Sequence, residues 1–164
     1  MAKSNLVIYT DGACAGNQYD HNTGGWGAII GEAGDGRAIE IYGGEPRTTN
    51  NRMELTAVIR ALETAAEMDP ASIVVHSDSA YIVNCFHQKW YVRWRQNGWK
   101  NAKKQPVENQ DLWEALLALA ERLPVTFKKV KGHAGVDLNE RADGLANRGI
   151  AEYPQGGSTR VDPD

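Results

Sequence analysis

The order of the apolar segments constrains the fold of this chain more than any other feature of its sequence. Three short strands are predicted first, at residues 6–10, 26–30 and 38–42, and the glycine-rich stretch 31–36 indicates a hairpin between the second and third strands. Short connections of this kind join antiparallel strands. The chain therefore begins with a predicted antiparallel trio.

The rest of the chain alternates helices with strands. A helix that Asn50 or Asn51 can cap is predicted up to Asp69 and Pro70, because its apolar residues recur at helical spacing. The run 73–76 is largely apolar at successive positions, which is typical of a strand covered on both faces. Further helices are predicted near residues 80–86, 110–122 and 139–150, with a strand at 125–130.

This order predicts an α/β protein with a mixed sheet and helices on both faces. We expect five strands, three of them antiparallel and two parallel, and we expect strand 73–76 to lie parallel to the first strand. The domain is predicted to span residues 1–152. From Tyr153 onward, Pro, Gly and Ser without periodicity predict a flexible C-terminal tail over residues 153–164.

The composition is that of one globular domain from a reducing compartment. A chain of 164 residues is long enough for a single core. Cys14 and Cys85 form neither a CxxC pair nor a disulfide framework. No apolar run approaches the roughly 20 residues of a membrane helix, and residues 1–5 lead directly into the first strand without the apolar region of a signal peptide. We therefore expect a cytoplasmic protein with no membrane contact and, because no apolar interface is evident, a monomer.

Four acidic residues stand where the predicted layout would bring them to one site. Asp11 follows the first strand and Asp78 follows its predicted parallel neighbour, so both are expected at the same edge of the sheet. Glu54 lies in the first turns of the next helix, and Asp143 lies in the last helix. Oxygen ligands without a Cys or His cluster suit Mg²⁺ or Mn²⁺ better than zinc. Two such ions could activate a water and stabilise the leaving oxygen in phosphodiester hydrolysis.

Each of these acids also has an ordinary structural explanation when it is taken alone. Asp11 before Gly12 is a common turn pair, and Asp78 between two serines can cap a helix. Glu54 can pair with a neighbouring arginine, and Asp143 can be a solvated helix residue. The sequence around each acid therefore has to decide between the two explanations.

A basic and aromatic segment at about residues 87–106 stands out from the acidic remainder. The net charge of the whole chain is −3, yet no acidic residue occurs between His87 and Lys104. The basic and aromatic residues of this stretch are Lys89, Trp90, Tyr91, Arg93, Trp94, Arg95, Trp99, Lys100, Lys103 and Lys104. Such a segment can bind phosphates through its charges while its rings contact a nucleic-acid strand. The alternative is an amphipathic helix whose tryptophans face the core and whose lysines are merely solvated.

Several short motifs surround these residues and carry a family resemblance. In chain order they are YTDG at 9–12, TTNNRMEL at 48–55, SDS at 77–79, VKGHAG at 130–135 and NERAD at 139–143. From about residue 5 to residue 150 the chain resembles a type 1 ribonuclease H of the bacterial kind. The TTNNRMEL and KGHAG blocks are the most specific parts of this resemblance, whereas a lone TDG would be weak.

The resemblance implies the ribonuclease H-like fold and an endoribonuclease that hydrolyses the RNA strand of RNA-DNA hybrids. Asp11, Glu54, Asp78 and Asp143 match the family's metal-binding catalytic acids, which use two Mg²⁺ ions, with Mn²⁺ as a possible substitute. Water would attack phosphorus in line and leave 3′-OH and 5′-phosphate ends. The implied partner is the hybrid itself, recognised through the 2′-OH groups by which RNA differs from DNA. Whether DNA-replication proteins recruit the enzyme is left open by the motifs.

The resemblance also implies a set of substrate contacts. Asn17, Asn50 and Asn51 match polar positions near the groove, where their amides can donate and accept hydrogen bonds. Thr49 and Asn109 match a pocket that holds a phosphate of the DNA strand. The residues that match the family's basic protrusion, which contacts the DNA strand, are Trp90, Arg93, Trp94 and Trp99.

His133 is the histidine that we expect to act in the reaction. Gly132 and Gly135 flank it, and the ordinary pKa of a histidine suits proton transfer near neutrality. In the family this histidine assists proton transfer or product release. Glu140 resembles an acid linked to metal exchange, although pairing with Arg141 explains it equally well.

The chain departs from the family pattern in three places. Ala80 stands where the family commonly has Gln, which removes one expected amide contact to the hybrid. The loop 18–23 is longer than the usual Asn-Pro-Gly run. Residues 136–138 replace the more familiar His-Pro-Glu and add a carboxylate near the site.

Other functions are compatible with parts of this pattern. A hybrid-binding module that has lost catalysis would bind without needing the acids. A DNA-cutting relative of the same fold, such as an integrase or a junction resolvase, would lack the KGHAG loop and the protrusion. A metal-free ribonuclease that uses histidine pairs would resist a chelator, but only His133 is suitably placed for that chemistry.

Overall fold

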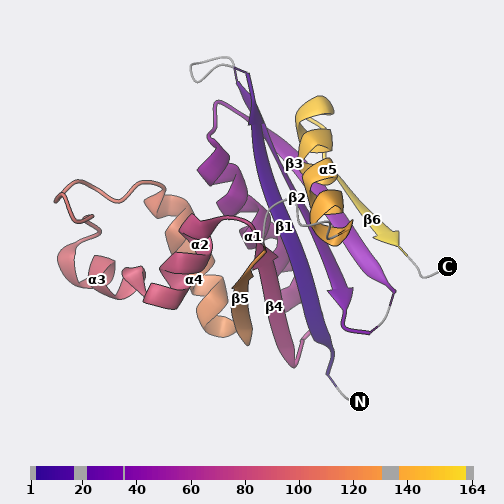
Figure 1. Ribbon diagram of the computed structural model, residues 1–164, viewed down its shortest axis with the longest axis horizontal. Coiled ribbons are helices and arrows are strands. Elements are labelled where there is room, and N and C mark those ends of the chain that lie inside the picture. Colours follow the sequence, from indigo (N-terminus) through magenta and orange to yellow (C-terminus); the bar gives the residue numbers. More distant parts are fainter. Residues whose placement is uncertain (1–2, 17–21, 35, 131–136, 162–164) are drawn as a thin grey trace.

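The computed structural model describes residues 3–16, 22–34, 36–130 and 137–161. One sheet runs through the molecule, with the strand order β5-β4-β1-β2-β3-β6 (Figure 1). The strands are β1 (Asn5–Ala15), β2 (Thr23–Glu32), β3 (Ala38–Pro46), β4 (Ser72–Ser77), β5 (Val125–Lys129) and β6 (Gly157–Val161). The helices are α1 (Asn50–Ala66), α2 (Ala80–Gln88), α3 (Trp90–Asn97), α4 (Gln110–Arg122) and α5 (Asp137–Ala151).

The strand directions confirm the predicted mixed sheet. β1 pairs antiparallel with β2, which pairs antiparallel with β3. On its other side β1 pairs parallel with β4, which pairs parallel with β5. The chain is therefore an α/β protein in which β1 is the central strand and joins the antiparallel half of the sheet to the parallel half.

A sixth strand at the edge of the sheet corrects the prediction of five. β6 pairs antiparallel with β3, from Ala38 opposite Val161 to Tyr42 opposite Gly157. The flexible tail predicted after residue 152 therefore contains a strand. Its middle residues are exposed, so an apolar alternation was not needed and none appears in the sequence.

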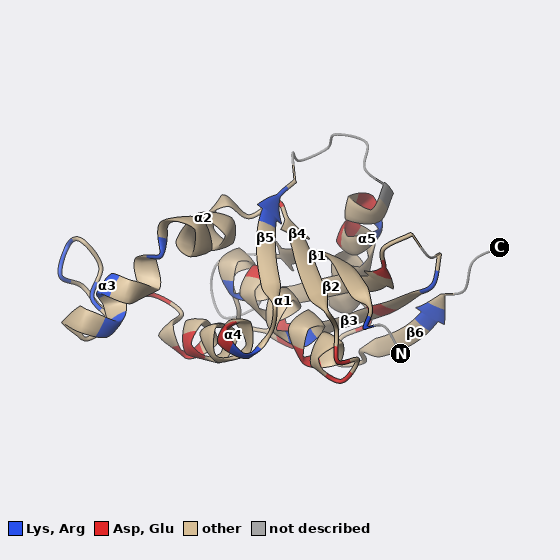
Figure 2. Cartoon of the chain, turned by 90° about the horizontal axis from the view of Figure 1, so that it is seen from below, with Lys and Arg blue, Asp and Glu red and all other residues tan. Residues whose placement is uncertain are grey.

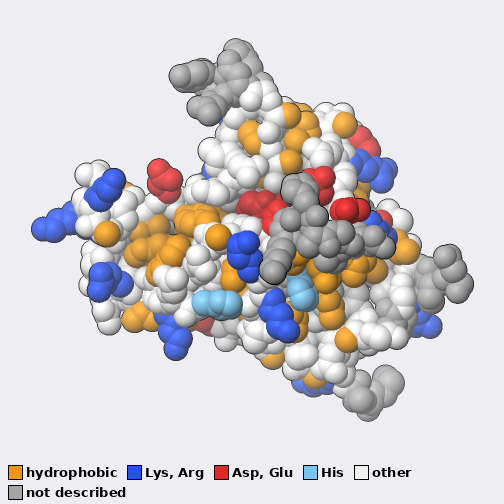
Figure 3. All heavy atoms as spheres, in the orientation of Figure 1, with side chains coloured by type: hydrophobic (Ala, Val, Ile, Leu, Met, Phe, Trp, Pro, Cys, Tyr) orange, Lys and Arg blue, Asp and Glu red, His pale blue; other side chains and the backbone are white. Residues whose placement is uncertain are grey.

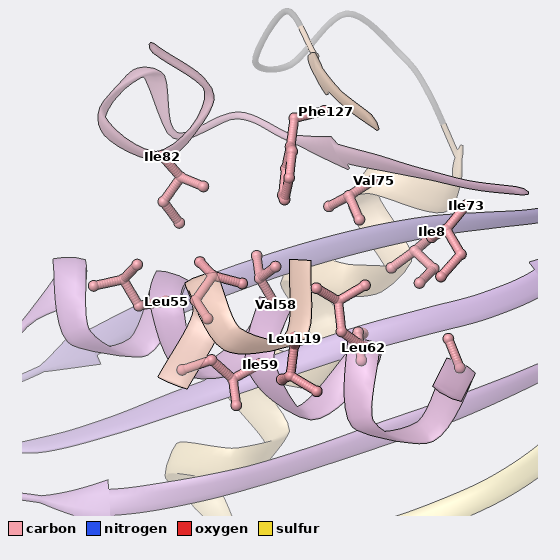
Figure 4. Packing of buried hydrophobic residues seen from close by; sticks show 14 of the residues in the cluster. Ile8, Leu55, Val58, Ile59, Leu62, Ile73, Val75, Ile82, Leu119 and Phe127 are labelled. Atoms are coloured by element: carbon pink, nitrogen blue, oxygen red, sulfur yellow. The ribbon is translucent and has the colours of Figure 1, made fainter. Parts of the chain in front are cut away.

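Helices cover both faces of the sheet, as predicted. α1 packs against β1 and β2 on one face, with α4 beside it, whereas α5 lies across β1, β2 and β3 on the other face (Figures 1 and 2). Alternate residues of β1 serve the two faces, since Ile8 belongs to the main core and Tyr9 packs against the cluster under α5. Figure 4 shows the main core, where side chains of α1 meet those of the sheet, α2 and α4.

The start of α1 differs by one residue from the prediction. Thr49, rather than Asn50 or Asn51, is the N-cap, and its side chain accepts a hydrogen bond of 3.1 Å from the backbone N–H of Arg52. The helix ends at Ala66, shortly before the predicted end at Asp69. The cap places Asn50 and Asn51 in the first turn, exposed to solvent.

The basic segment forms a protrusion that leaves the body of the molecule between α2 and α4 (Figure 1). Lys89, in the left-handed conformation with φ 54°, ends α2 and begins α3. Trp94 of α3 is buried and its ring lies 5.6 Å from that of Trp113 in α4. The packed rings agree with the alternative of tryptophans that face the core, and binding by the exposed basic side chains stays a prediction. None of the helices in the described part of the chain combines the length and apolar character needed to cross a membrane.

Candidate metal centre and substrate surface

Three of the four predicted acids meet in the structure. One carboxylate oxygen each from Asp11, Glu54 and Asp78 lie within 4.8 Å of one another. We call these three residues the acidic cluster. Asp11 is 7% exposed and Glu54 is 5% exposed, whereas Asp78 is half-buried. The side chains that the sequence singled out are therefore neighbours in space.

Parallel pairing of β1 with β4 brings Asp11 and Asp78 together. The register places Tyr9 opposite His76, and each acid follows two residues later, Asp11 within β1 and Asp78 just after the end of β4. One detail of the prediction is wrong, because β1 does not stop at Asp11 but continues to Ala15. Since β4 ends one residue before Asp78, the carboxyl group of Asp11 lies where its neighbouring strand has just ended.

Gly12 allows α1 to carry Glu54 into the cluster. Its backbone N–H donates to Glu54 Oε1 and to Asp11 Oδ1, at 2.9 Å in each case. A Cβ atom at this position would lie 2.4 Å from the backbone nitrogen of Glu54. Sequence reasoning treated Gly12 only as a turn residue and so missed this role. The available signal was a glycine inside what proves to be a long strand, where glycine often marks a close approach of another backbone.

α5 brings Asp143 toward the cluster from the opposite face of the sheet. The helix lies close to β2 at Gly27, where a Cβ atom would be 2.5 Å from Leu145 Cβ and 2.8 Å from Ala142 O. The side chain of Asp143 is exposed, and it interacts electrostatically with Asp11. Asp143 therefore lies near Asp11 on the solvent side, outside the three-residue acidic cluster.

Burial raises the pKa values of the two inner acids. For Asp11 burial is the largest cause, and the carboxylates of Asp78 and Asp143 also raise its pKa. For Glu54 burial is again the largest cause, followed by the charge of Asp11. Each shift means that the charged form is disfavoured until a counter-charge is present.

The donor set of the cluster fits a hard divalent cation. Glu54 Oε2 is buried and has no hydrogen-bond partner among the described residues, although buried carboxylate oxygens normally have one. All ligand atoms offered by the cluster are carboxylate oxygens, which suit Mg²⁺ and Mn²⁺. A bound cation would pair with this oxygen and offset the repulsion that, together with burial, raises the pKa values of Asp11 and Glu54.

Arg52 connects the two residues predicted to hold a phosphate. Its backbone N–H donates to Thr49 Oγ1, and its guanidinium Nη1 donates to Asn109 Oδ1 at 3.3 Å. The same guanidinium makes an ion pair of 2.8 Å with Asp111. Thr49 and Asn109 therefore both bond to Arg52, at the two ends of that residue, even though α1 and α4 are distant in sequence. Sequence reasoning missed Arg52, although it lies inside the TTNNRMEL motif.

The protrusion presents its basic side chains beside an apolar patch. A hollow of about 760 Å³ is lined by residues that include Trp90, Arg93, Trp94 and Lys100. In Figure 3, the protrusion at the left and the acidic side chains near the centre are open on the same face of the molecule. Trp99 is half-buried and its ring lies 5.5 Å from that of Trp94. Of the remaining predicted residues, Asn17 and His133 lie outside the described residues.

The chain is similar to known ribonucleases H. Residues 3–151 match the family model described as RNase H. Ribonuclease H of Moorella thermoacetica is 53% identical over 146 residues, which cover 89% of this chain and 91% of that protein. Ribonuclease H of Alcanivorax borkumensis is 52% identical over 148 residues, covering 90% of this chain and 93% of that protein.

Two solved structures extend the comparison. LC9-RNase H1, described as a type 1 RNase H with the type 2 active-site motif, superposes with a TM-score of 0.84 at 30% identity and covers 99% of this chain and 79% of that chain. The foamy viral protease-reverse transcriptase in complex with an RNA/DNA hybrid gives a TM-score of 0.72 at 20% identity, covering 90% of this chain and 20% of that chain. The second likeness concerns the fold alone.

Proposed function

The chain belongs to the RNase H family, and on that premise we propose that it cuts the RNA strand of RNA-DNA hybrids at the acidic cluster with Mg²⁺ as its metal. The family membership makes it a metal-dependent endoribonuclease. The specific metal, the ligand set and the substrate contacts are the parts that we propose. Mn²⁺ is a chemically suitable substitute.

The observation that carries this proposal is the buried oxygen of Glu54 within the acidic cluster, which has no hydrogen-bond partner in the part of the chain that the structure describes. Asp11, Glu54, Asp78 and Asp143 would hold two ions between them. When bound, such ions supply the charge that activates a water and stabilises the leaving 3′ oxygen, which leaves 3′-OH and 5′-phosphate ends. The Gly12 N–H holds the inner carboxylates of Asp11 and Glu54 in their orientation before any substrate arrives.

The surface around the cluster would bind the two strands differently. Asn17, Asn50 and Asn51 would contact the RNA strand, where amides can both donate to and accept from 2′-OH groups. Thr49 and Asn109 would hold a phosphate of the DNA strand, beside the positive charge of Arg52. The basic protrusion would contact the DNA strand further along, through Trp90, Arg93, Trp94 and Trp99.

Three further proposals concern His133, the extent of the catalytic domain, and the location and oligomeric state of the protein. His133 would assist proton transfer or product release, as its resemblance implies. Residues 1–152 would form the catalytic domain, with β6 as an addition to the edge of its sheet. We also propose that the protein is cytoplasmic. We propose a monomer because Val92 and Tyr153 are the only large apolar residues that the described part of the chain exposes.

The test uses an end-labelled RNA-DNA hybrid with matched RNA and DNA duplexes, with Mg²⁺ or with chelator. The variant is Asp11→Asn, and the matched control is Asp69→Asn, which makes the same chemical change at an exposed acid far from the cluster. We expect the parent and the control to cut only the RNA of the hybrid, and only with metal. Asp11→Asn should lose at least about 10³-fold in rate.

Two results would overturn the proposal in different ways. Tight hybrid binding without cleavage by the parent protein would indicate a binding module that has lost catalysis. Metal-dependent cutting of the DNA duplex would indicate a DNA-cutting relative of the same fold.

A further inference from the structure

We propose that Asn22 is a positioning residue that holds the start of α1 in the orientation needed to bind the hybrid. It acts on the connector between β3 and α1, residues 47–49. The inference rests on the proposed function, because it takes Thr49, Asn50 and Asn51 as hybrid contacts. We call these three residues the hybrid-binding segment.

Asn22 makes three hydrogen bonds with the connector. The Thr48 N–H donates to Asn22 Oδ1 at 2.9 Å, and Asn22 Nδ2 donates to the Thr48 carbonyl oxygen at 2.8 Å. The Arg47 N–H donates to the backbone oxygen of Asn22 at 3.1 Å. The side-chain amide therefore donates to and accepts from the backbone of a single residue, which a primary amide can do and an apolar side chain cannot.

The middle of the connector depends on these bonds because Thr48 is buried and the residue before it, Arg47, has a left-handed backbone. Asn22 and Thr48 are each 7% exposed, so water cannot replace the amide as the partner of the Thr48 backbone. Arg47 has φ 51°, a left-handed conformation that costs free energy in a residue other than glycine. The other contact to the Thr48 carbonyl is a weak one from Cys14 Sγ at 3.7 Å. Removal of the Asn22 side chain would leave the Thr48 N–H without a partner among the described residues.

The position of Thr48 decides where the hybrid-binding segment lies, because the next residue, Thr49, is the N-cap of α1. The segment is exposed and relies on the connector for its orientation. Glu54, in contrast, has an anchor of its own in the Gly12 N–H, 2.9 Å from Oε1. Loss of Asn22 should therefore displace the substrate contacts more than the metal ligand.

The experiment compares steady-state cleavage of a hybrid by the full-length parent and by Asn22→Ala. We expect KM to rise about tenfold while kcat changes less than about twofold, because the interaction that is lost serves binding rather than the chemical step. Asn22→Ser, whose hydroxyl can serve only one of the two Thr48 groups well, should give an intermediate KM. Ile73→Val, a core change at the far end of β4, is the control for a general loss of stability and should leave KM unchanged.

A second measurement does not depend on activity. Amide hydrogen exchange at Thr48 should speed up in Asn22→Ala and stay slow in Ile73→Val, since the bond from the Thr48 N–H to Asn22 Oδ1 protects that amide. Faster exchange together with a higher KM would support the positioning role.

Other results would contradict it. An unchanged KM in Asn22→Ala, or a fall in kcat alone, would overturn the inference, because the connector would then not serve the hybrid-binding segment. Failure of the parent to cut the hybrid would instead reject the proposed function. In that case the ratio of hybrid Kd values between the parent and Asn22→Ala would still decide whether Asn22 positions a binding surface.

Discussion

The acidic cluster and the basic protrusion differ in the burial and the hydrogen bonding of their polar side chains. In the cluster, Glu54 is buried with one carboxylate oxygen lacking a partner among the described residues. In the protrusion, charged side chains are exposed, and turns are closed by full hydrogen bonds such as the pair between Asn97 and Lys100 at 2.9 Å. Arg95 makes two bonds of 2.8 Å to Glu121 of α4. The cluster therefore has an oxygen, unpaired in the described part of the chain, that a ligand could pair with, whereas these polar groups of the protrusion are paired within it or with α4.

The difference follows from the solvent around each group. Exposed charges keep most of their hydration and gain little from pairing, so their removal changes stability by about 1 kcal/mol or less. Buried carboxylates that repel one another cost free energy until a cation arrives. Substitutions in the acidic cluster and in the protrusion should therefore change the free energy of unfolding by different amounts and in different directions.

The largest expected effect is that of Gly12→Ala. The added Cβ atom would lie 2.4 Å from the backbone of Glu54, so α1 would have to move away from β1. We expect a loss of about 3 kcal/mol of unfolding free energy, together with most of the activity. Urea unfolding followed by circular dichroism would measure the first quantity.

Gly144→Ala is the matched control for this change. Gly144 lies in α5 with nothing within 4 Å of an added Cβ atom, so the same substitution there should stabilise the protein by about 0.5 to 1 kcal/mol. Equal effects of the two variants would show that the close contact at Gly12 is unimportant.

The next effect is the pH dependence of stability in metal-free protein. Because burial raises the folded-state pKa of Glu54, the folded protein holds a proton that the unfolded chain releases above pH about 4. The Glu54 carboxyl group therefore stabilises the folded protein fully below that pH. This stabilisation is lost as the pH rises toward the raised pKa of Glu54. Glu54→Gln should flatten this slope and stabilise the metal-free protein at pH 8 by about 1 to 2 kcal/mol.

Thermal unfolding across pH, with chelator, would check this expectation. Glu67 is an exposed acid at the other end of α1, so Glu67→Gln should leave the dependence of stability on pH unchanged. Mg²⁺ should stabilise the parent more than Glu54→Gln, because the ion binds the folded state through this carboxylate. A steeper slope in Glu54→Gln than in the parent would contradict the assignment.

The smallest effect is expected in the protrusion. Arg93→Ala removes an exposed charge beside the hollow at Trp94, so stability should change by less than about 0.5 kcal/mol. Hybrid binding should weaken a few-fold, and the slope of log K against log salt should fall by about one. A salt titration of the hybrid Kd measures both. Arg60→Ala, in α1 and away from the protrusion, should leave the salt slope as it is in the parent.

Local chemistry made much of the fold predictable. The bounds of α4 agree with the prediction because Gln110 to Arg122 has a regular apolar period, and α1 ends close to Pro70 because proline cannot continue a helix. The edge strand β6 was missed because an exposed strand needs no apolar alternation. The continuation of β1 beyond Asp11 was missed because the Asp-Gly pair also signals a turn.

The residues of the candidate site were likewise predictable only in part. Asp11, Glu54 and Asp78 could be named in advance because acidic residues at predicted strand and helix ends suit a metal and because their surrounding motifs are distinctive. The roles of Asn22 and Arg52 were not predicted, even though Arg52 lies in the TTNNRMEL motif, since those roles lie in bonds to residues distant in the chain, such as Thr48 and Asn109. Nothing in the local sequence around an asparagine or an arginine indicates such a partner.

The sequence by itself determined the order of strands and helices, the chemical type of the site and the family. These properties depend on periodicity and on residue type, which are local. Only the tertiary structure decided that Gly12 must be small, that Asn22 supports the start of α1 and that the tail adds a strand to β3. The physical reason is that close contact and burial are set by elements that meet in space, and a pKa or an unpartnered oxygen exists only once they have met.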